Sequence, residues 1–195
     1  MKNTVSLTRI VVIGSESTGK THLTQRLSEF FDCTYSEEAA RLYVEKHPRQ
    51  LQASDVVPIA LSQISLQDKA IQNAKNLILH DTDLFSTVIY SKYYYQASPD
   101  WILKKARLQA SDLYLLCDID LPWQPEPLFR DQGSTEARRQ VHTNFLDLII
   151  KEQLNMRIIK GTGEKRTQMA IDIVERFISK NKRTARWIDN TASDN

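Results

Sequence analysis

The chain has 195 residues, 41% of them hydrophobic and 26% charged, which is the composition of a globular domain with a single core. Its formal net charge of +2 argues against a dedicated nucleic-acid-binding protein, which would be far more basic. The two cysteines, Cys33 and Cys117, lie in apolar runs and indicate no disulfide framework or zinc site, and no apolar run reaches transmembrane length. We therefore expect one domain over residues 1–187, a flexible tail at 188–195, a cytoplasmic location, and neither a membrane nor a nucleic-acid partner.

Short apolar runs alternate with longer helical patterns along the chain. The runs with strand character occupy residues 9–13, 33–36, 76–81, 112–118 and 156–161. The helical patterns begin at residue 20 and continue over 37–47, 54–75, the stretch through 95, 98–110 and 164–180, and a basic helix start ends the proline-rich segment 119–140. This alternation predicts βαβ units, and hence a parallel sheet with helices on both faces.

Residues 14–21 read GSESTGKT, which is the Walker A pattern, placed between a buried strand and an amphipathic helix. The glycines let backbone amides approach phosphates closely, and the helix adds its positive N-terminus. Lys20 is expected to reach the outer phosphates of ATP, and the Thr21 hydroxyl is expected to bind Mg²⁺. The residues expected to hold the nucleotide are Gly14, Ser15, Glu16, Ser17, Thr18, Gly19, Lys20, Thr21 and His22. The predicted fold is a three-layer α/β P-loop NTPase fold with five parallel strands in the order 2-3-1-4-5.

Among P-loop proteins, the chain best fits a small-molecule kinase. It lacks the Asn-Lys-x-Asp motif of GTPases, and it has no room for the additional domains of motor and ring ATPases. A kinase needs carboxylates near the acceptor hydroxyl, cations to neutralise the transferring phosphoryl group, and a lid that excludes water.

Carboxylates follow two of the predicted strands, at the edge where ligands bind in open parallel sheets. Glu37 and Glu38 follow the second strand, and Arg41 shares a helix face with Glu38. Asp81 and Asp83 follow the third strand. We expect Asp81 or Glu38 to accept the proton of the acceptor hydroxyl, and Asp81 to assist Thr21 at the metal. The alternative for the glutamates is charge stabilisation of a helix start, and for the aspartates it is helix capping.

The segment over about residues 121–140 is expected to form a lid. Its prolines and Gly133 bracket Arg130, Arg138 and Arg139, which would stabilise the phosphoryl group when the lid closes. The alternative is a solvated loop with surface arginines.

Aromatic residues are concentrated between Tyr90 and Trp101, and Trp123 lies in the lid. Tyr94, Trp101 and Trp123 could form a box for a planar ring, which would attract a cationic ring directly. The alternative is helix packing. His80 is expected to be packed in the core rather than to act as a base.

The order of these segments resembles the ribosylnicotinamide kinase domain of NadR-type proteins, a P-loop, nucleoside-kinase-like AAA family. The resemblance rests on EEAARLYVE, on HDTDLFST, on PDWI, and on DLYLLCDIDLPWQPEPLFRDQG, which contains Pro122, Trp123, Arg130 and Asp131. It implies ATP-dependent phosphorylation of the 5′-hydroxyl of nicotinamide riboside to give nicotinamide mononucleotide. The pyridinium cation of that riboside would give the carboxylates and the aromatic residues a shared role. The residues expected to bind the substrate are Glu38, Arg41, Asp83, Tyr94, Trp101 and Trp123.

The chain differs from NadR proteins in lacking the His-x-Gly-His motif of their adenylyltransferase domain, so we expect a stand-alone kinase. Two other functions remain open: a kinase for another (deoxy)nucleoside or small metabolite, and a non-catalytic ATP-binding sensor. A homo-oligomeric state also remains open.

Overall fold

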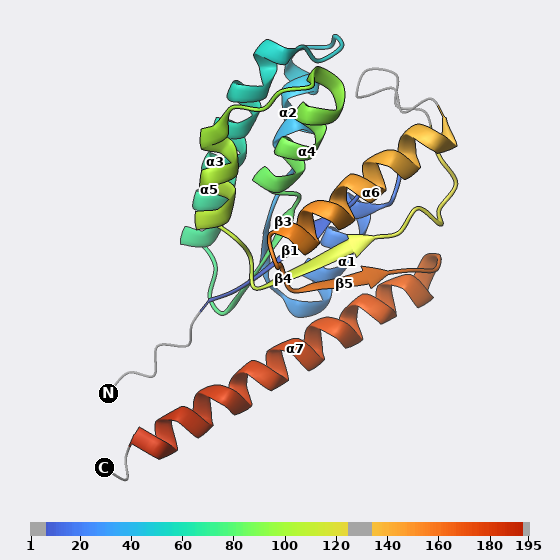
Figure 1. Ribbon diagram of the computed structural model, residues 1–195. Coiled ribbons are helices and arrows are strands. Elements are labelled where there is room, and N and C mark those ends of the chain that lie inside the picture. The colour runs from blue at the N-terminus through green and yellow to red at the C-terminus, as the bar shows by residue number, and fades with distance from the viewer. Residues whose placement is uncertain (1–6, 125–133, 193–195) are drawn as a thin grey trace.

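The computed structural model describes residues 7–124 and 134–192, with side chains as far as residue 180 (Figure 1). The sheet has five parallel strands in the order β2-β3-β1-β4-β5, which confirms the predicted topology. The strands are β1 (Thr8–Ile13), β2 (Thr34–Ser36), β3 (Leu77–Asp81), β4 (Leu113–Cys117) and β5 (Met156–Ile159).

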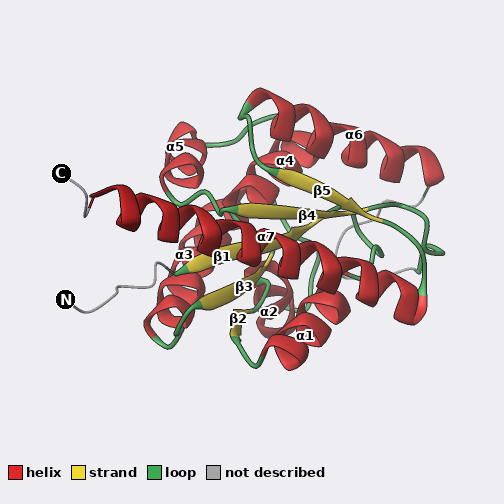
Figure 2. Ribbon diagram, turned by 90° about the horizontal axis from the view of Figure 1, so that it is seen from below, coloured by secondary structure: helices red, strands yellow, loops and turns green. Residues whose placement is uncertain are grey.

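Helices cover both faces of this sheet. On one face lie α1 (Lys20–Phe31) and α7 (Gly163–Ala192) (Figure 2). The other face carries α2 (Ala39–Lys46), α3 (Val56–Gln72), α4 (Leu84–Tyr95), α5 (Asp100–Leu108) and α6 (Thr135–Lys151), and the 3₁₀ helix η1 (Ala53–Asp55) precedes α3. The result is the three-layer α/β fold expected from the sequence.

The core consists of two layers because successive residues of a strand point to opposite faces. Val11 and Ile13 of β1 pack with α4 and α6. Ile10 and Val12 pack with α1 and α7. The strand is therefore apolar at every central position, as expected for a parallel sheet covered on both sides.

Parts of two helices fall within the expected lid and the expected tail. Helix α6 begins at Thr135, where the Ser134 hydroxyl accepts a hydrogen bond from the Ala137 N–H, so residues 135–140 of the expected lid are helical. Helix α7 extends to Ala192, so residues 188–192 of the expected tail have helical backbone, and residues 164–192 contain no proline or glycine that would end the helix. No helix in the described part of the chain is long and apolar enough to cross a bilayer.

His80 is packed, as predicted, and only 2% of it is exposed. Its Nδ1 lies 2.8 Å from the Ser36 hydroxyl oxygen on the neighbouring strand. Burial, with a smaller contribution from the positive charge of Arg9, lowers the pKa of His80 from 6.5 to about 4. The imidazole is therefore neutral at physiological pH, and it is unsuited to act as a base from this position.

The neutral state of His80 makes stability depend on pH. Between pH 6.5 and about 4 the unfolded chain binds a proton that the folded chain does not, so stability present above pH 6.5 is lost as the pH falls through that window. We expect this histidine to remove about 1 kcal/mol of unfolding free energy per pH unit. Urea unfolding at several pH values should show a shallower loss in His80→Gln. The exposed His47→Gln is the control, and an identical loss in all three proteins would contradict the assignment.

Candidate nucleotide-binding and phosphoryl-transfer site

The phosphate-binding loop connects β1 to α1 at the carboxyl edge of the sheet. Gly14 has a φ of 146°, and a Cβ built on it would lie 2.9 Å from the carbonyl oxygen of Cys117, at the end of β4. Gly19 has a φ of 73° and caps the N-terminus of α1. Both positions require glycine, the first because another backbone is close and the second because the conformation is left-handed.

The carbonyl oxygens of the loop point into the protein. The Tyr90 hydroxyl on α4 donates to Gly14 O at 3.2 Å. The Thr18 hydroxyl and the Lys20 ammonium donate to Ser15 O at 2.7 and 3.1 Å. With its carbonyl groups directed inward and held there, the loop can present backbone amides to a ligand.

Two buried arginines donate to two further carbonyl groups of the loop, those of Ser17 and Thr18. Arg138 of α6 donates to Ser17 O at 3.0 Å. Arg166 of α7 donates to Thr18 O, also at 3.0 Å. Helices on both faces of the sheet therefore support the same loop.

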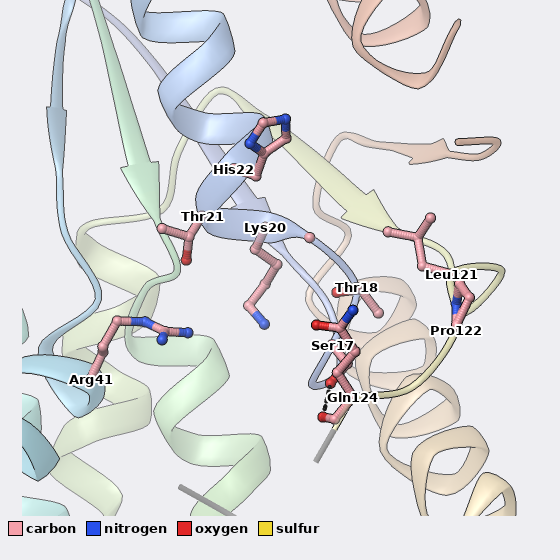
Figure 3. Close-up of a pocket in the computed structure, with 10 residues that line it drawn as sticks. Ser17, Thr18, Lys20, Thr21, His22, Arg41, Leu121, Pro122 and Gln124 are labelled. Atoms are coloured by element: carbon pink, nitrogen blue, oxygen red, sulfur yellow. Dashed lines mark hydrogen bonds between the residues drawn. The ribbon is translucent and has the colours of Figure 1, made fainter. Parts of the chain in front are cut away.

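A pocket of about 340 Å³ opens beside the loop, within the size range of ligand sites. The Lys20 ammonium and the Arg41 guanidinium point into it from opposite sides (Figure 3). The residues that line it are Ser17, Thr18, Gly19, Lys20, Thr21, His22, Arg41, Leu121, Pro122 and Gln124. Its cationic walls suit a polyphosphate.

Asp81, the last residue of β3, does not itself line this pocket, but it interacts with Thr21, Lys20 and Arg41, which do. The Thr21 hydroxyl and the positive charges of Lys20 and Arg41 favour its ionised form, whereas the negative charge of Glu38 disfavours it. Burial, with a further contribution from Glu38, raises the pKa of Asp81 to about 6. A carboxyl group with this pKa is suited to accept a proton near neutral pH.

Two buried glutamines of α3 position the backbone around these carboxylates. Gln63 Oε1 accepts a 2.9 Å hydrogen bond from the Ala39 N–H, so the N-terminus of α2 is capped without the Glu38 side chain. Gln67 Nε2 donates to Thr82 O, directly after Asp81. The side chain of Glu38, whose residue is 8% exposed, therefore makes no hydrogen bond that caps its own helix.

Thr21 and Asp81 fit a magnesium site of the P-loop kind. The Oδ1 atom of Asp81 is buried and has no hydrogen-bond partner among the described residues. Those residues contain no cluster of three or more His, Cys, Asp or Glu side chains that could hold a metal alone. Mg²⁺ needs no such cluster, because it usually combines one or two protein oxygens with waters and substrate phosphates.

The Asp83 side chain caps a helix, which agrees with the capping alternative given for it. Its side chain accepts a 3.2 Å hydrogen bond from the Ser86 N–H and caps α4. Burial raises the pKa of Asp83 to about 6, against the lowering effects of the Ser86 N–H and the Tyr114 hydroxyl. Like Glu38 and Asp81, Asp83 is not among the residues that line the pocket, so its capping bond is what distinguishes it.

The expected aromatic box is only partly assembled. The Tyr94 hydroxyl donates to Glu16 of the phosphate loop at 3.3 Å, and Tyr94 lines a small apolar hollow together with Tyr90 and Tyr95. Trp101 and Trp123 are 36% and 39% exposed, and neither lines the pocket or this hollow.

The expected lid arginines are in different environments. Arg130 lies outside the described residues. Arg139 is exposed and pairs with Glu136 on the same helix at 3.6 Å. Arg138 is buried in α6, with 5% exposure, and donates to backbone carbonyls.

Sequence reasoning missed Arg166 and Asp120. Arg166 donates to Asp120 at 2.7 Å and contacts the phosphate loop from α7. One signal could have revealed it: Arg166 precedes Ala170, Ile171 and Val174 at helical spacing, so it occupies the apolar face of α7. A charged residue on a buried face needs a partner.

The fold and the loop define a nucleotide-binding protein of the P-loop class. A family model described as an AAA domain matches residues 9–166, and the chain belongs to this family. It is homologous to NadR, which confirms the resemblance seen in the sequence.

The chain is 30% identical over 147 residues to the trifunctional NAD biosynthesis/regulator protein NadR of Salmonella typhimurium, covering 73% of this chain and 35% of that one. It is 24% identical over 178 residues to the protein of the same description from Escherichia coli, covering 89% and 43%. The chain thus spans less than half the length of these relatives.

Solved structures support the same relationship as the sequence comparisons. A NadR protein crystallised in complex with NR is 25% identical, with a TM-score of 0.73, over 87% of this chain and 50% of that one. Thymidylate kinase from Ehrlichia chaffeensis, at 14% identity and a TM-score of 0.64 over 87% and 99%, shares the fold alone.

The structural position of Asp83 can be tested by removing its side chain. Asp83→Ala should lower the unfolding free energy by roughly 1–2 kcal/mol, the usual cost of losing a helix N-cap. Nucleotide affinity should not change. Urea unfolding and ATP titration of the same preparations separate the two effects, and unaltered stability with a selective loss of ligand binding would contradict the capping role.

Proposed function

We propose that this chain is an ATP-dependent kinase that transfers the terminal phosphoryl group to the 5′-hydroxyl of nicotinamide riboside, giving nicotinamide mononucleotide. The observation that carries this proposal is the convergence of Lys20, Thr21, Arg41, Glu38 and Asp81 beside the phosphate-binding loop. This set combines a polyphosphate site with carboxylates suited to an acceptor hydroxyl, which a simple nucleotide-binding module would not need.

Homology supports the choice of riboside. The related proteins are described as acting in NAD biosynthesis, and the NadR structure that this chain matches contains NR. Nicotinamide riboside carries a pyridinium cation. The carboxylates of Glu38 and Asp81 offer the negative charge that such a ring favours.

In the proposed mechanism, Lys20 and the loop amides bind the donor phosphates and stabilise the charge that develops on them. The acceptor hydroxyl loses its proton to Asp81 or Glu38, its oxygen bonds to the γ-phosphorus, and ADP leaves. Thr21 and Asp81 would hold Mg²⁺, which supplies charge neutralisation on the phosphate oxygens. Arg130 from the expected lid, and Arg139 from the first turns of α6, are proposed to approach the phosphoryl group.

An assay of ADP release with magnesium-ATP tests this proposal. Nicotinamide riboside should stimulate ADP formation, with mononucleotide identified by mass, and Lys20→Ala should abolish turnover because it removes the cation nearest the phosphates. Cytidine, uridine and thymidine serve as comparison acceptors.

Two results would redirect the assignment. ADP formation with only another nucleoside would keep the mechanism and change the acceptor. ATP binding without product from any acceptor would favour a non-catalytic sensor.

The pH dependence of activity should identify the base. If Asp81 accepts the proton, activity falls on acidification through its pKa, which is about 6 in the ligand-free chain. Glu38→Gln should then move this acid limb to lower pH, because the charge of Glu38 raises the pKa of Asp81. Profiles of kcat/KM for wild type, Glu38→Gln and Asp81→Asn provide the measurement. An acid limb that disappears in Glu38→Gln and persists in Asp81→Asn would make Glu38 the base.

A further inference from the structure

Arg138 and Arg166 make parallel contacts to the phosphate-binding loop from opposite faces of the sheet. Each residue is only 5% exposed. They donate to successive carbonyl oxygens of the loop, those of Ser17 and Thr18. Residues on two separate helices, 28 positions apart in the sequence, thus converge on one dipeptide.

The same two guanidinium groups also bind successive residues after β4. Arg138 donates to Leu121 O at 2.7 Å. Arg166 donates to the Asp120 carboxylate at 2.7 Å, and Asp120 accepts a further hydrogen bond from the Gly161 N–H. Each arginine therefore joins the phosphate-binding loop to the segment 120–121, which leads toward the expected lid.

Ser17 needs such support because its backbone is strained. Its φ of 53° lies in the left-handed region, which costs a residue with a side chain roughly 1–2 kcal/mol. Its hydroxyl donates to Gln124 O at 2.8 Å, and its carbonyl accepts from Arg138. A strained conformation persists only where surrounding contacts hold it, and such residues occur where a ligand site is pre-organised.

The two arginines differ in how their charge is compensated. Arg166 forms an ion pair with Asp120. Arg138 has no ion-pair partner within residues 7–124 and 134–180, and burial lowers its pKa. A buried cation held by carbonyl dipoles is unfavourable alone and is stabilised when a polyanion binds nearby.

We propose that Arg138 and Arg166 are positioning residues that lock Ser17 and Thr18 in the phosphate-binding conformation by fastening them to residues 120 and 121. In this role Arg138 does not swing in with the lid as first expected, because both of its terminal nitrogens are engaged with backbone carbonyls. The inference deepens the proposed function, and it rests on that function only in requiring that the loop bind nucleotide phosphates.

Arginine-to-lysine substitutions test it, because lysine keeps the charge but cannot bridge two acceptors in the geometry of a guanidinium group. Magnesium-ATP and inorganic tripolyphosphate would be titrated calorimetrically into wild type, Arg138→Lys and Arg166→Lys. Each substitution should lower the affinity for both ligands by about tenfold, the effect expected of losing one charge-assisted hydrogen bond. The KM of the riboside at saturating ATP should stay unchanged, because the loop and not the acceptor side is altered.

Arg107→Lys is the matched control. Arg107 lies on α5, away from the phosphate-binding loop, and it also makes two hydrogen bonds to one carboxylate, that of Glu152. Its substitution should therefore leave phosphate affinity unchanged. Thermal unfolding of every variant identifies any that does not fold, and if Arg166→Lys fails to fold, Arg138→Lys still decides the matter.

Folded Arg138→Lys protein with wild-type affinity for both phosphate ligands would overturn the inference. A loss of riboside affinity as large as the loss of phosphate affinity would also overturn it. Failure of the proposed function looks different. If wild type binds ATP but phosphorylates no riboside, while both lysine variants lose tripolyphosphate affinity, the positioning role stands and the kinase assignment falls.

Discussion

A phosphate-binding loop that turns its amide groups toward a ligand must turn its carbonyl groups into the protein, where each buried carbonyl oxygen needs a donor. In this chain several donors come from far along the sequence: Tyr90 on α4, Arg138 on α6 and Arg166 on α7. The loop can therefore keep its shape only when helices on both faces of the sheet are in place. Folding and phosphate binding depend on the same hydrogen bonds.

The order of the strands decides which groups meet beside that loop. β1 lies at the centre of the sheet, with β3 on one side and β4 on the other. Asp81 at the end of β3 and Glu38 after β2 therefore lie to one side, near Lys20 and Arg41, where an acceptor hydroxyl would find both base and cation. On the β4 side, the ion pair of Asp120 with Arg166 joins the loop to the rest of the fold. The carboxylates beside the loop thus lie on the β3 side of this edge, and the ion pair that supports the loop lies on its β4 side.

Much of this arrangement could be predicted from the sequence. The Walker A pattern located the loop, and the rule that parallel strands end at one edge brought Glu38 and Asp81 to it. Asp83 was ambiguous, because an aspartate after a strand is equally suited to cap a helix or to bind a ligand, and only its hydrogen bond from the Ser86 N–H shows the cap. Arg138 was assigned to a lid, because its position near prolines concealed that it lies on the buried face of a helix.

The sequence by itself determined the class of fold and the residues that can bind phosphate, because these depend on local patterns: apolar periodicity, glycine spacing and residue type at strand ends. The strand order was predicted only as a property of that fold class. Only the tertiary structure decided which charged side chains support the loop and which face the pocket. Arg138, Arg139 and Arg166 look alike as letters, yet one lies in solvent and two are buried against carbonyl oxygens. Their surroundings are set by elements distant in the chain, and pairing between distant groups leaves no local pattern to read.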